Sequence, residues 1–175
     1  NACISASQLL HVAAARVVPQ FEKAIDKALL GCIGEMPKML GKTAVLVDVS
    51  GSMDAPLSGK SDMRRIDAAA ALASLIDGDV RVFTFSNALV EVPHRLGMSG
   101  VDAIINSQPH GGTQLGGALA HLYQEVSFDR LIVVTDEQSH DRVPEPKGRG
   151  YMINVASNRN GVGYGGWTHI DGFSE

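Results

Sequence analysis

The stretch TAVLVDVSGS, residues 43–52, decides the fold class of this 175-residue chain. Apart from Asp48, its first seven residues are apolar or β-branched, which is typical of a strand that is buried on both faces of a parallel sheet. The strand ends in Asp48 and a Ser-Gly-Ser turn. Polar side chains therefore gather at the carboxyl end of the strand, where open α/β sheets bind their ligands.

Helical and strand patterns alternate on the C-terminal side of this stretch. Apolar residues at helical spacing predict helices around 66–76 and 115–126. Further β-branched runs predict strands at 80–85, 130–135 and 150–155, and a short strand at 89–92 predicts one hairpin. We therefore expect an α/β fold with a doubly wound, mostly parallel central sheet flanked by helices.

The first forty residues carry a helical pattern of their own. A capping box at residues 5–8 and the apolar spacing after it predict a helix over about 6–30, with Pro19 as a break or kink. We divide the chain into an N-terminal helical segment, residues 1–40, and an α/β domain, residues 41–175. Because the chain begins with Asn1 rather than Met, we expect it to be part of a longer protein.

The turn after the first strand predicts a metal site. Asp48 offers an anionic oxygen, and Ser50 and Ser52 offer two neutral oxygens. Gly51 is expected to make this tight turn sterically possible. Such an all-oxygen set suits a hard divalent cation and does not suit a soft metal.

Two further segments are candidates for the remaining oxygen ligands. The Gly111-Gly112 pair is expected to let the backbone come close, and Thr113 is expected to open the next helix. Asp136 ends the strand at 131–134 in the same way that Asp48 ends the first strand. If these two strands are neighbours at the switch point of the sheet, both carboxylates face one pocket.

The pattern Asp48-x-Ser50-x-Ser52, followed by Thr113 and Asp136, resembles the metal-ion-dependent adhesion site of von Willebrand factor A domains, which have a Rossmann-like fold. Longer stretches resemble the A domain of TROVE-module proteins, the family of the Ro autoantigen and its bacterial relatives. These stretches are residues 46–53, 63–72, 80–86, 110–115 and 169–174.

This resemblance implies that the hydroxyls of Ser50, Ser52 and Thr113 coordinate the metal, and that Asp48 and Asp136 bind it directly or through water. It also implies an open coordination position, which the Asp or Glu carboxylate of a partner protein could occupy. Mg²⁺ or Mn²⁺ is the expected cation, with Ca²⁺ as the alternative. TROVE relatives hold small non-coding RNAs in a ring of helical repeats, so RNA binding is expected from the rest of the parent protein.

Charge and hydropathy limit the classes of partner. The net charge of −4 and the scattered basic residues give no cationic face, which disfavours direct binding of nucleic acid by this segment. No apolar run approaches the ~18 residues of a membrane-spanning helix. Cys3 and Cys32 lack the spacing of metal ligands and are interpreted as free thiols. We therefore expect a cytoplasmic protein without a membrane partner.

These observations favour a non-enzymatic, metal-dependent binding module of a Ro-type RNA-binding protein. One alternative is a Mg²⁺-dependent phosphoester hydrolase, since an aspartate at a strand end also serves such chemistry. Against it, phosphatases of this type carry a second aspartate where this chain has Ser50, and no phosphate-binding loop motif is present. The other alternative is a structural domain whose metal stiffens its loops.

Several polar residues near these motifs are assigned ordinary roles. Asp54 and Asp62 are expected in a loop and at a helix N-cap, and Arg64-Arg65 is expected to be a solvated helix start. Glu137 could lie behind the metal site or be exposed. The six histidines lack ligand spacing and are expected at the surface or in ordinary hydrogen bonds, with His110 singled out because it adjoins Thr113. Trp167 is expected to cover the edge of the core.

Overall fold

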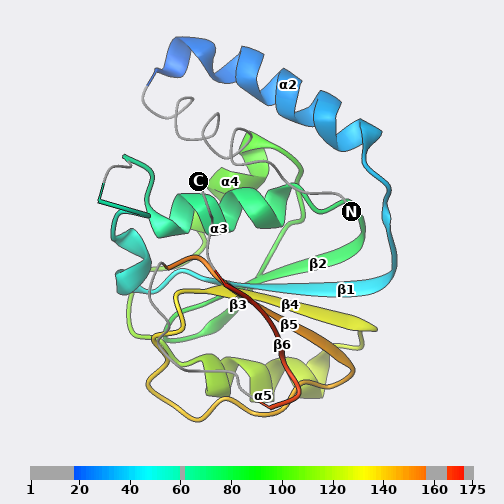
Figure 1. The fold of residues 1–175 in the computed structure, drawn as a ribbon, viewed down its shortest axis with the longest axis vertical. Coiled ribbons are helices and arrows are strands. Elements are labelled where there is room, and N and C mark those ends of the chain that lie inside the picture. Colours follow the sequence, from blue (N-terminus) through cyan, green and yellow to red (C-terminus); the bar gives the residue numbers. More distant parts are fainter. Residues whose placement is uncertain (1–17, 60–61, 157–164, 172–175) are drawn as a thin grey trace.

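The computed structural model describes residues 18–59, 62–156 and 165–171, which form a six-stranded sheet with helices on both faces (Figure 1). The strand order is β3-β2-β1-β4-β5-β6. β3 is antiparallel to β2, and all other neighbours in the sheet are parallel. The strands are β1 (Met39–Asp48), β2 (Gly78–Phe85), β3 (Leu89–Val92), β4 (Arg130–Thr135), β5 (Arg149–Asn154) and β6 (Thr168–Asp171). The predicted doubly wound sheet, including its hairpin, is confirmed.

The helices form two layers around the sheet. In Figure 1, α3 and α4 cover one face, α5 covers the other, and α2 lies outside α3 and α4. The helices are α2 (Glu22–Glu35), α3 (Arg65–Ser74), α4 (Met98–Ile105) and α5 (Leu115–Glu125), and the short 3₁₀ helices are η1 (Pro19–Phe21) and η2 (Gly51–Asp54). None of the helices in the described parts of the chain has the length and hydropathy needed to cross a membrane.

The core has one apolar cluster on each face of the sheet, one under α3 and α4 and the other under α5. Every residue of α3 from Ile66 to Ser74 is buried. Five of these are alanines with no exposed surface, so the helix packs closely against the sheet on one side and against α4 on the other. This packing holds the start of α3 near the carboxyl ends of the strands, as Figure 1 shows.

The N-terminal helix differs in detail from the expected one. Its described part extends to Glu35, five residues beyond the expected end, and residues 1–17 lie outside the described chain. Pro19 begins η1, which leads directly into α2, a position that suits the missing N–H of proline. Leu29 and Ile33 are buried in the same cluster as α3 and α4, and Asp26 accepts a hydrogen bond from the backbone N–H of Met98 (2.8 Å). This helix therefore packs on other helices rather than on the sheet.

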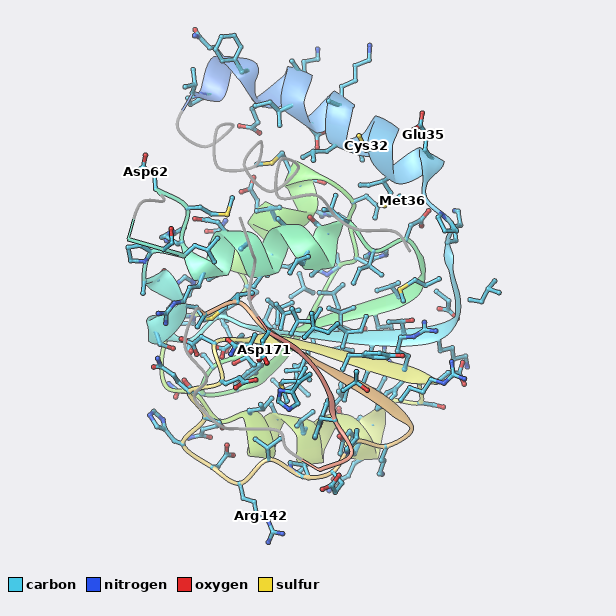
Figure 2. The ribbon with its side chains drawn as sticks, in the orientation of Figure 1. Cys32, Glu35, Met36, Asp62, Arg142 and Asp171 are labelled. Atoms are coloured by element: carbon cyan, nitrogen blue, oxygen red, sulfur yellow. The ribbon has the colours of Figure 1, made fainter. Side chains whose placement is uncertain are left out.

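The other expectations have different outcomes. The sequence patterns did not predict α4 or β6, both of which are short. Asp62 is not the N-cap of α3: the cap residue is Arg64, and Figure 2 shows Asp62 pointing away from the body of the protein.

Trp167 is buried, and its ring N–H donates to the carbonyl of Pro144 (3.0 Å), as expected of an aromatic that covers the core. Cys32 is an exposed free thiol, and Cys3 lies outside the described residues.

Candidate metal centre

Asp48 is the last residue of β1, and its carboxylate is fully buried. Its Oδ1 accepts a hydrogen bond from the backbone N–H of Ser50 (2.9 Å), and its Oδ2 accepts one from the hydroxyl of Thr135 (2.7 Å). Thr135 is the last residue of β4, which pairs in parallel with β1. The neighbouring strand ends required by the predicted site are thus present, and Asp48 is held in one orientation between them.

The turn after β1 brings the two serine hydroxyls together. Ser50 Oγ and Ser52 Oγ are 3.2 Å apart, close enough to bind one ion or to share a hydrogen bond. Gly51 does not have the steric role that the sequence suggested, because its φ is not positive and a Cβ there would meet its neighbours at ordinary contact distance. Instead, the backbone N–H of Gly51 donates to the carbonyl of Gly111 (2.9 Å). This bond ties the serine turn to the loop that carries Thr113.

The Thr113 loop is held from two sides. A Cβ on Gly111 or Gly112 would meet the side chain of Asn87, so these glycines let the loop lie close to that side chain. The close approach of their backbone to a metal remains a prediction. The buried Thr113 accepts a hydrogen bond at its carbonyl from the backbone N–H of His140 (3.1 Å). Thr113 does not open α5, which begins two residues later at Leu115. It belongs to the loop that η2 contacts.

Asp136 follows β4 directly and has no exposed surface. Its Oδ2 accepts a hydrogen bond from Arg65 Nη1 (2.8 Å), and its Oδ1 accepts one from the backbone N–H of Gln138 (3.3 Å). Arg65, the first residue of α3, was expected to be solvated, but its side chain is only 17% exposed. That expectation was wrong because the buried carboxylate of Asp136 attracts the guanidinium. Asp136 lies 71 positions further along the chain, so the residues around Arg65 do not indicate this contact.

The neighbouring polar residues support the loops. Both oxygens of Asp54 are engaged, one by Arg64 Nη1 (3.1 Å) and the other by the ring Nδ1 of His110 (2.9 Å). The second ring nitrogen of His110 lies 3.0 Å from the carbonyl of Ile105. His110 therefore connects η2 to the end of α4 and has no ring nitrogen left over for the metal. Arg64 also pairs with Asp67, so neither arginine of the pair is simply solvated.

The donor chemistry of the site fits a hard dication. Two buried carboxylates and the Ser50 and Ser52 hydroxyls, with Thr113 on a loop tied to the same turn, provide oxygen atoms only. Burial raises the pKa of Asp48 to about 6, although its hydrogen bonds to Ser50 and Thr135 oppose this rise. Desolvation of a carboxylate is a cost that a bound cation would offset. Ligation of a metal by these five residues remains a prediction.

Metal binding should depend on pH, because a cation and a proton compete for Asp48. With a pKa of about 6, most of the Asp48 population is charged at pH 7 and most of it is protonated at pH 5. We expect the affinity for Mg²⁺ to be about tenfold weaker at pH 5 than at pH 7. Isothermal titration at the two pH values measures this ratio. Equal affinities would show that Asp48 does not exchange a proton for the metal.

Comparisons with known proteins agree with the fold. A family model described as "VWA domain containing CoxE-like protein" matches residues 41–147. Among solved structures, the fold is similar to that of the Ro (RSR) protein of Deinococcus radiodurans, with a TM-score of 0.66 and 17% identity over 89% of this chain. The matched region spans only 36% of the length of that Ro protein.

A second solved structure, an aerotolerance-related membrane protein of Bacteroides fragilis carrying mutations to serine, has a TM-score of 0.45 and 16% identity. The match covers 65% of this chain and 66% of that protein. No curated protein sequence matches the chain.

Proposed function

Because this chain belongs to the family of VWA domain containing CoxE-like proteins, we propose that it is a non-enzymatic module that binds a partner protein through a divalent cation. The cation, Mg²⁺ or Mn²⁺, is held by Asp48, Ser50, Ser52, Thr113 and Asp136. The observation that carries the proposal is the pair of buried carboxylates at the ends of the adjacent strands β1 and β4. Although Asp48 accepts two hydrogen bonds, burial still raises its pKa to about 6, and a bound cation would offset this cost of desolvation.

The charge of the site favours an acidic partner. Asp48 and Asp136 contribute two negative charges, and Arg65 contributes one positive charge at 2.8 Å from Asp136. A bound dication turns this local charge of −1 into +1. A carboxylate from an Asp or Glu of the partner would then be attracted to the open position on the metal.

The contacts of His110 argue against its use as a general base. Hydrolysis of an ester or phosphoester needs a group that accepts a proton from the attacking water. His110 is the nearest histidine in sequence to Thr113, and both its ring nitrogens are engaged by Asp54 and Ile105. We therefore assign His110 to the support of the loops rather than to proton transfer.

The similarity in fold to the Ro protein of Deinococcus radiodurans supports a proposal for the parent protein. We propose that the parent is a cytoplasmic Ro-type protein that binds small non-coding RNA through regions outside this domain. The net charge of −4 supports this division of labour, since phosphate binding needs clustered basic residues. An acidic protein segment would bind at the metal while the RNA binds elsewhere.

The relaxation of water protons by Mn²⁺ tests the open coordination position. A Mn²⁺ ion with an exchangeable water ligand accelerates this relaxation, and a carboxylate that displaces the water reduces the effect. We expect a short peptide containing Glu to lower the relaxation rate of the Mn²⁺-loaded protein, and its Gln counterpart to leave the rate unchanged.

The Thr113→Ala variant should bind Mn²⁺ more weakly because it lacks one hydroxyl ligand. If both peptides leave the relaxation rate unchanged while Mn²⁺ is bound at this site, the metal only stiffens the loops. If the protein instead hydrolyses a generic phosphoester, and Asp48→Asn abolishes that turnover, the non-enzymatic proposal fails.

A further inference from the structure

A second group of metal-binding side chains lies beside the candidate metal centre. Glu137, His169 and Asp171 each offer one ligand atom, and these three atoms lie within 4.8 Å of one another. Within the group, His169 Nδ1 is 3.1 Å from Glu137 Oε1. This group has no local sequence motif, because Glu137 and His169 are 32 positions apart.

The sheet explains how the three residues meet. In the parallel pairing of β5 with β6, His169 is opposite Met152 and Asp171 is opposite Asn154. Because side chains alternate along a strand, His169 and Asp171 lie on the same face of β6. Asn154 in turn pairs with Thr135 at the end of β4, so the exit of β4 and the end of β6 lie at the same edge of the sheet. Figure 2 labels Asp171, the last described residue of β6.

Glu137 is fixed at the exit of β4. Its backbone has a φ of 60°, and its N–H donates to the hydroxyl of Thr135 (3.1 Å), the same hydroxyl that binds Asp48. Its side chain is only 2% exposed, so the carboxylate that contacts His169 is shielded from solvent. His169 is partly buried and Asp171 is exposed. The group therefore has a buried inner ligand and an outer ligand through which an ion could enter.

The ligand types differ from those of the oxygen site. One imidazole nitrogen and two carboxylates suit Zn²⁺, Co²⁺ or Mn²⁺, whereas Mg²⁺ binds imidazole poorly. Ligand atoms that share one zinc ion at about 2.0–2.2 Å are separated by ~3.4 Å in a tetrahedral arrangement. His169 Nδ1 and Glu137 Oε1, which are 3.1 Å apart, are already close to that spacing. The ligand atom of the exposed Asp171 lies within 4.8 Å of the other two, so a shift of about 1.4 Å or less brings it to that spacing.

From this geometry we propose that Glu137, His169 and Asp171 form a second divalent metal site, which prefers zinc-type ions to Mg²⁺. This proposal does not depend on the oxygen site. The two sites are formed by consecutive residues after β4, Asp136 for the first and Glu137 for the second. The fourth position of a tetrahedral ion would be open to water or to a further ligand.

Titration with Co²⁺ in excess Mg²⁺ tests the second site, because Co²⁺ bound to nitrogen and oxygen ligands absorbs visible light and Mg²⁺ occupies the oxygen site. We expect the full chain to bind one Co²⁺ that Zn²⁺ displaces and Mg²⁺ does not. His169→Gln and Asp171→Asn should each weaken Co²⁺ binding by more than about tenfold. Losing a group that only hydrogen-bonds to a metal ligand already weakens metal binding by about that factor. Circular dichroism checks that both variants fold.

His121→Gln is the matched control, because His121 forms a similar contact with Glu125 (2.9 Å) in which both side chains are exposed. This variant should bind Co²⁺ like the wild type. Binding should also persist in Asp48→Ala, so a failure of the oxygen site would leave the result intact. The proposal is overturned if His169→Gln binds Co²⁺ as tightly as the wild type, in which case His169 and Glu137 form an ion pair only.

Discussion

Replacing Asp48 with asparagine should abolish Mg²⁺ binding at the oxygen site and make the metal-free protein more stable at pH 7 than the metal-free wild type. Burial raises the pKa of Asp48 from its ordinary value of 3.8 to about 6. At pH 7 a charged Asp48 therefore reduces the free energy of unfolding by about 3 kcal/mol, because each pKa unit corresponds to ~1.4 kcal/mol. Asparagine keeps the shape of the side chain and removes the charge.

The gain in stability of Asp48→Asn over the metal-free wild type should depend on pH in a defined direction. Below pH 3.8 the carboxyl group is protonated in both the folded and the unfolded protein, so the wild type and Asp48→Asn should be similar in stability. The penalty on the wild type grows as the pH rises from about 4 to about 6. Urea unfolding of both proteins at pH 4 and pH 7 measures this difference.

The exposed Asp79 provides the control, because Asp79→Asn should leave stability nearly unchanged at both pH values. If Asp48→Asn is less stable than the metal-free wild type at pH 7, the charge on Asp48 is stabilised within the protein. The buried carboxylate would then have no energetic need for a cation.

Replacing Arg65 with alanine should destabilise the metal-free protein by about 3–5 kcal/mol, the usual cost of removing one partner of a buried ion pair. Asp136 has no exposed surface, and Arg65 Nη1 is 2.8 Å from its Oδ2. Without the guanidinium, the buried negative charge of Asp136 loses a stabilising partner in the folded protein, so the free energy of unfolding falls. Mg²⁺ restores a positive charge near Asp136, so it should stabilise Arg65→Ala more than it stabilises the wild type.

Arg81 offers a matched control for this prediction. Its Nε is also 2.8 Å from a carboxylate, that of Glu91, but both side chains are about half exposed. Arg81→Ala should therefore cost less than about 1 kcal/mol. Thermal unfolding of both variants with and without Mg²⁺ measures the difference. Equal costs for the two substitutions would show that burial of the pair with Asp136 does not matter.

The sequence was sufficient to predict the helices and strands whose residues show strong periodicity. The strands at 89–92 and 130–135 have the predicted bounds, because apolar and β-branched residues make up most of each strand. Two elements lacked such a signal. α4 has only eight residues, including Ser99 and Gly100, and β6 has four residues, none of which is fully buried. Short elements of this kind are stabilised by their contacts with the rest of the fold rather than by their own pattern.

The site was predictable where its chemistry lies in a local motif, and less so where it depends on distant contacts. The predicted site requires β1 and β4 to be neighbours, and the structure shows that these two strands pair in parallel. The ion pair of Arg65 with Asp136 and the contact of His169 with Glu137 join residues far apart in the sequence. Only the packing of α3 and β6 on the sheet brings them together. Gly51 was misjudged, because its role is a backbone N–H hydrogen bond that any residue except proline could make.

Anomalous diffraction from crystals grown with Mn²⁺ tests the central claim most directly, because it locates the ion without reference to any variant. We expect an anomalous peak within coordination distance of Ser50 Oγ, Ser52 Oγ and Thr113 Oγ1, with Asp48 and Asp136 bound directly or through water. A further peak at Glu137 would be compatible with this result. The absence of a peak between the serine turn and Asp136, in crystals that bind Mn²⁺ elsewhere, would contradict the account.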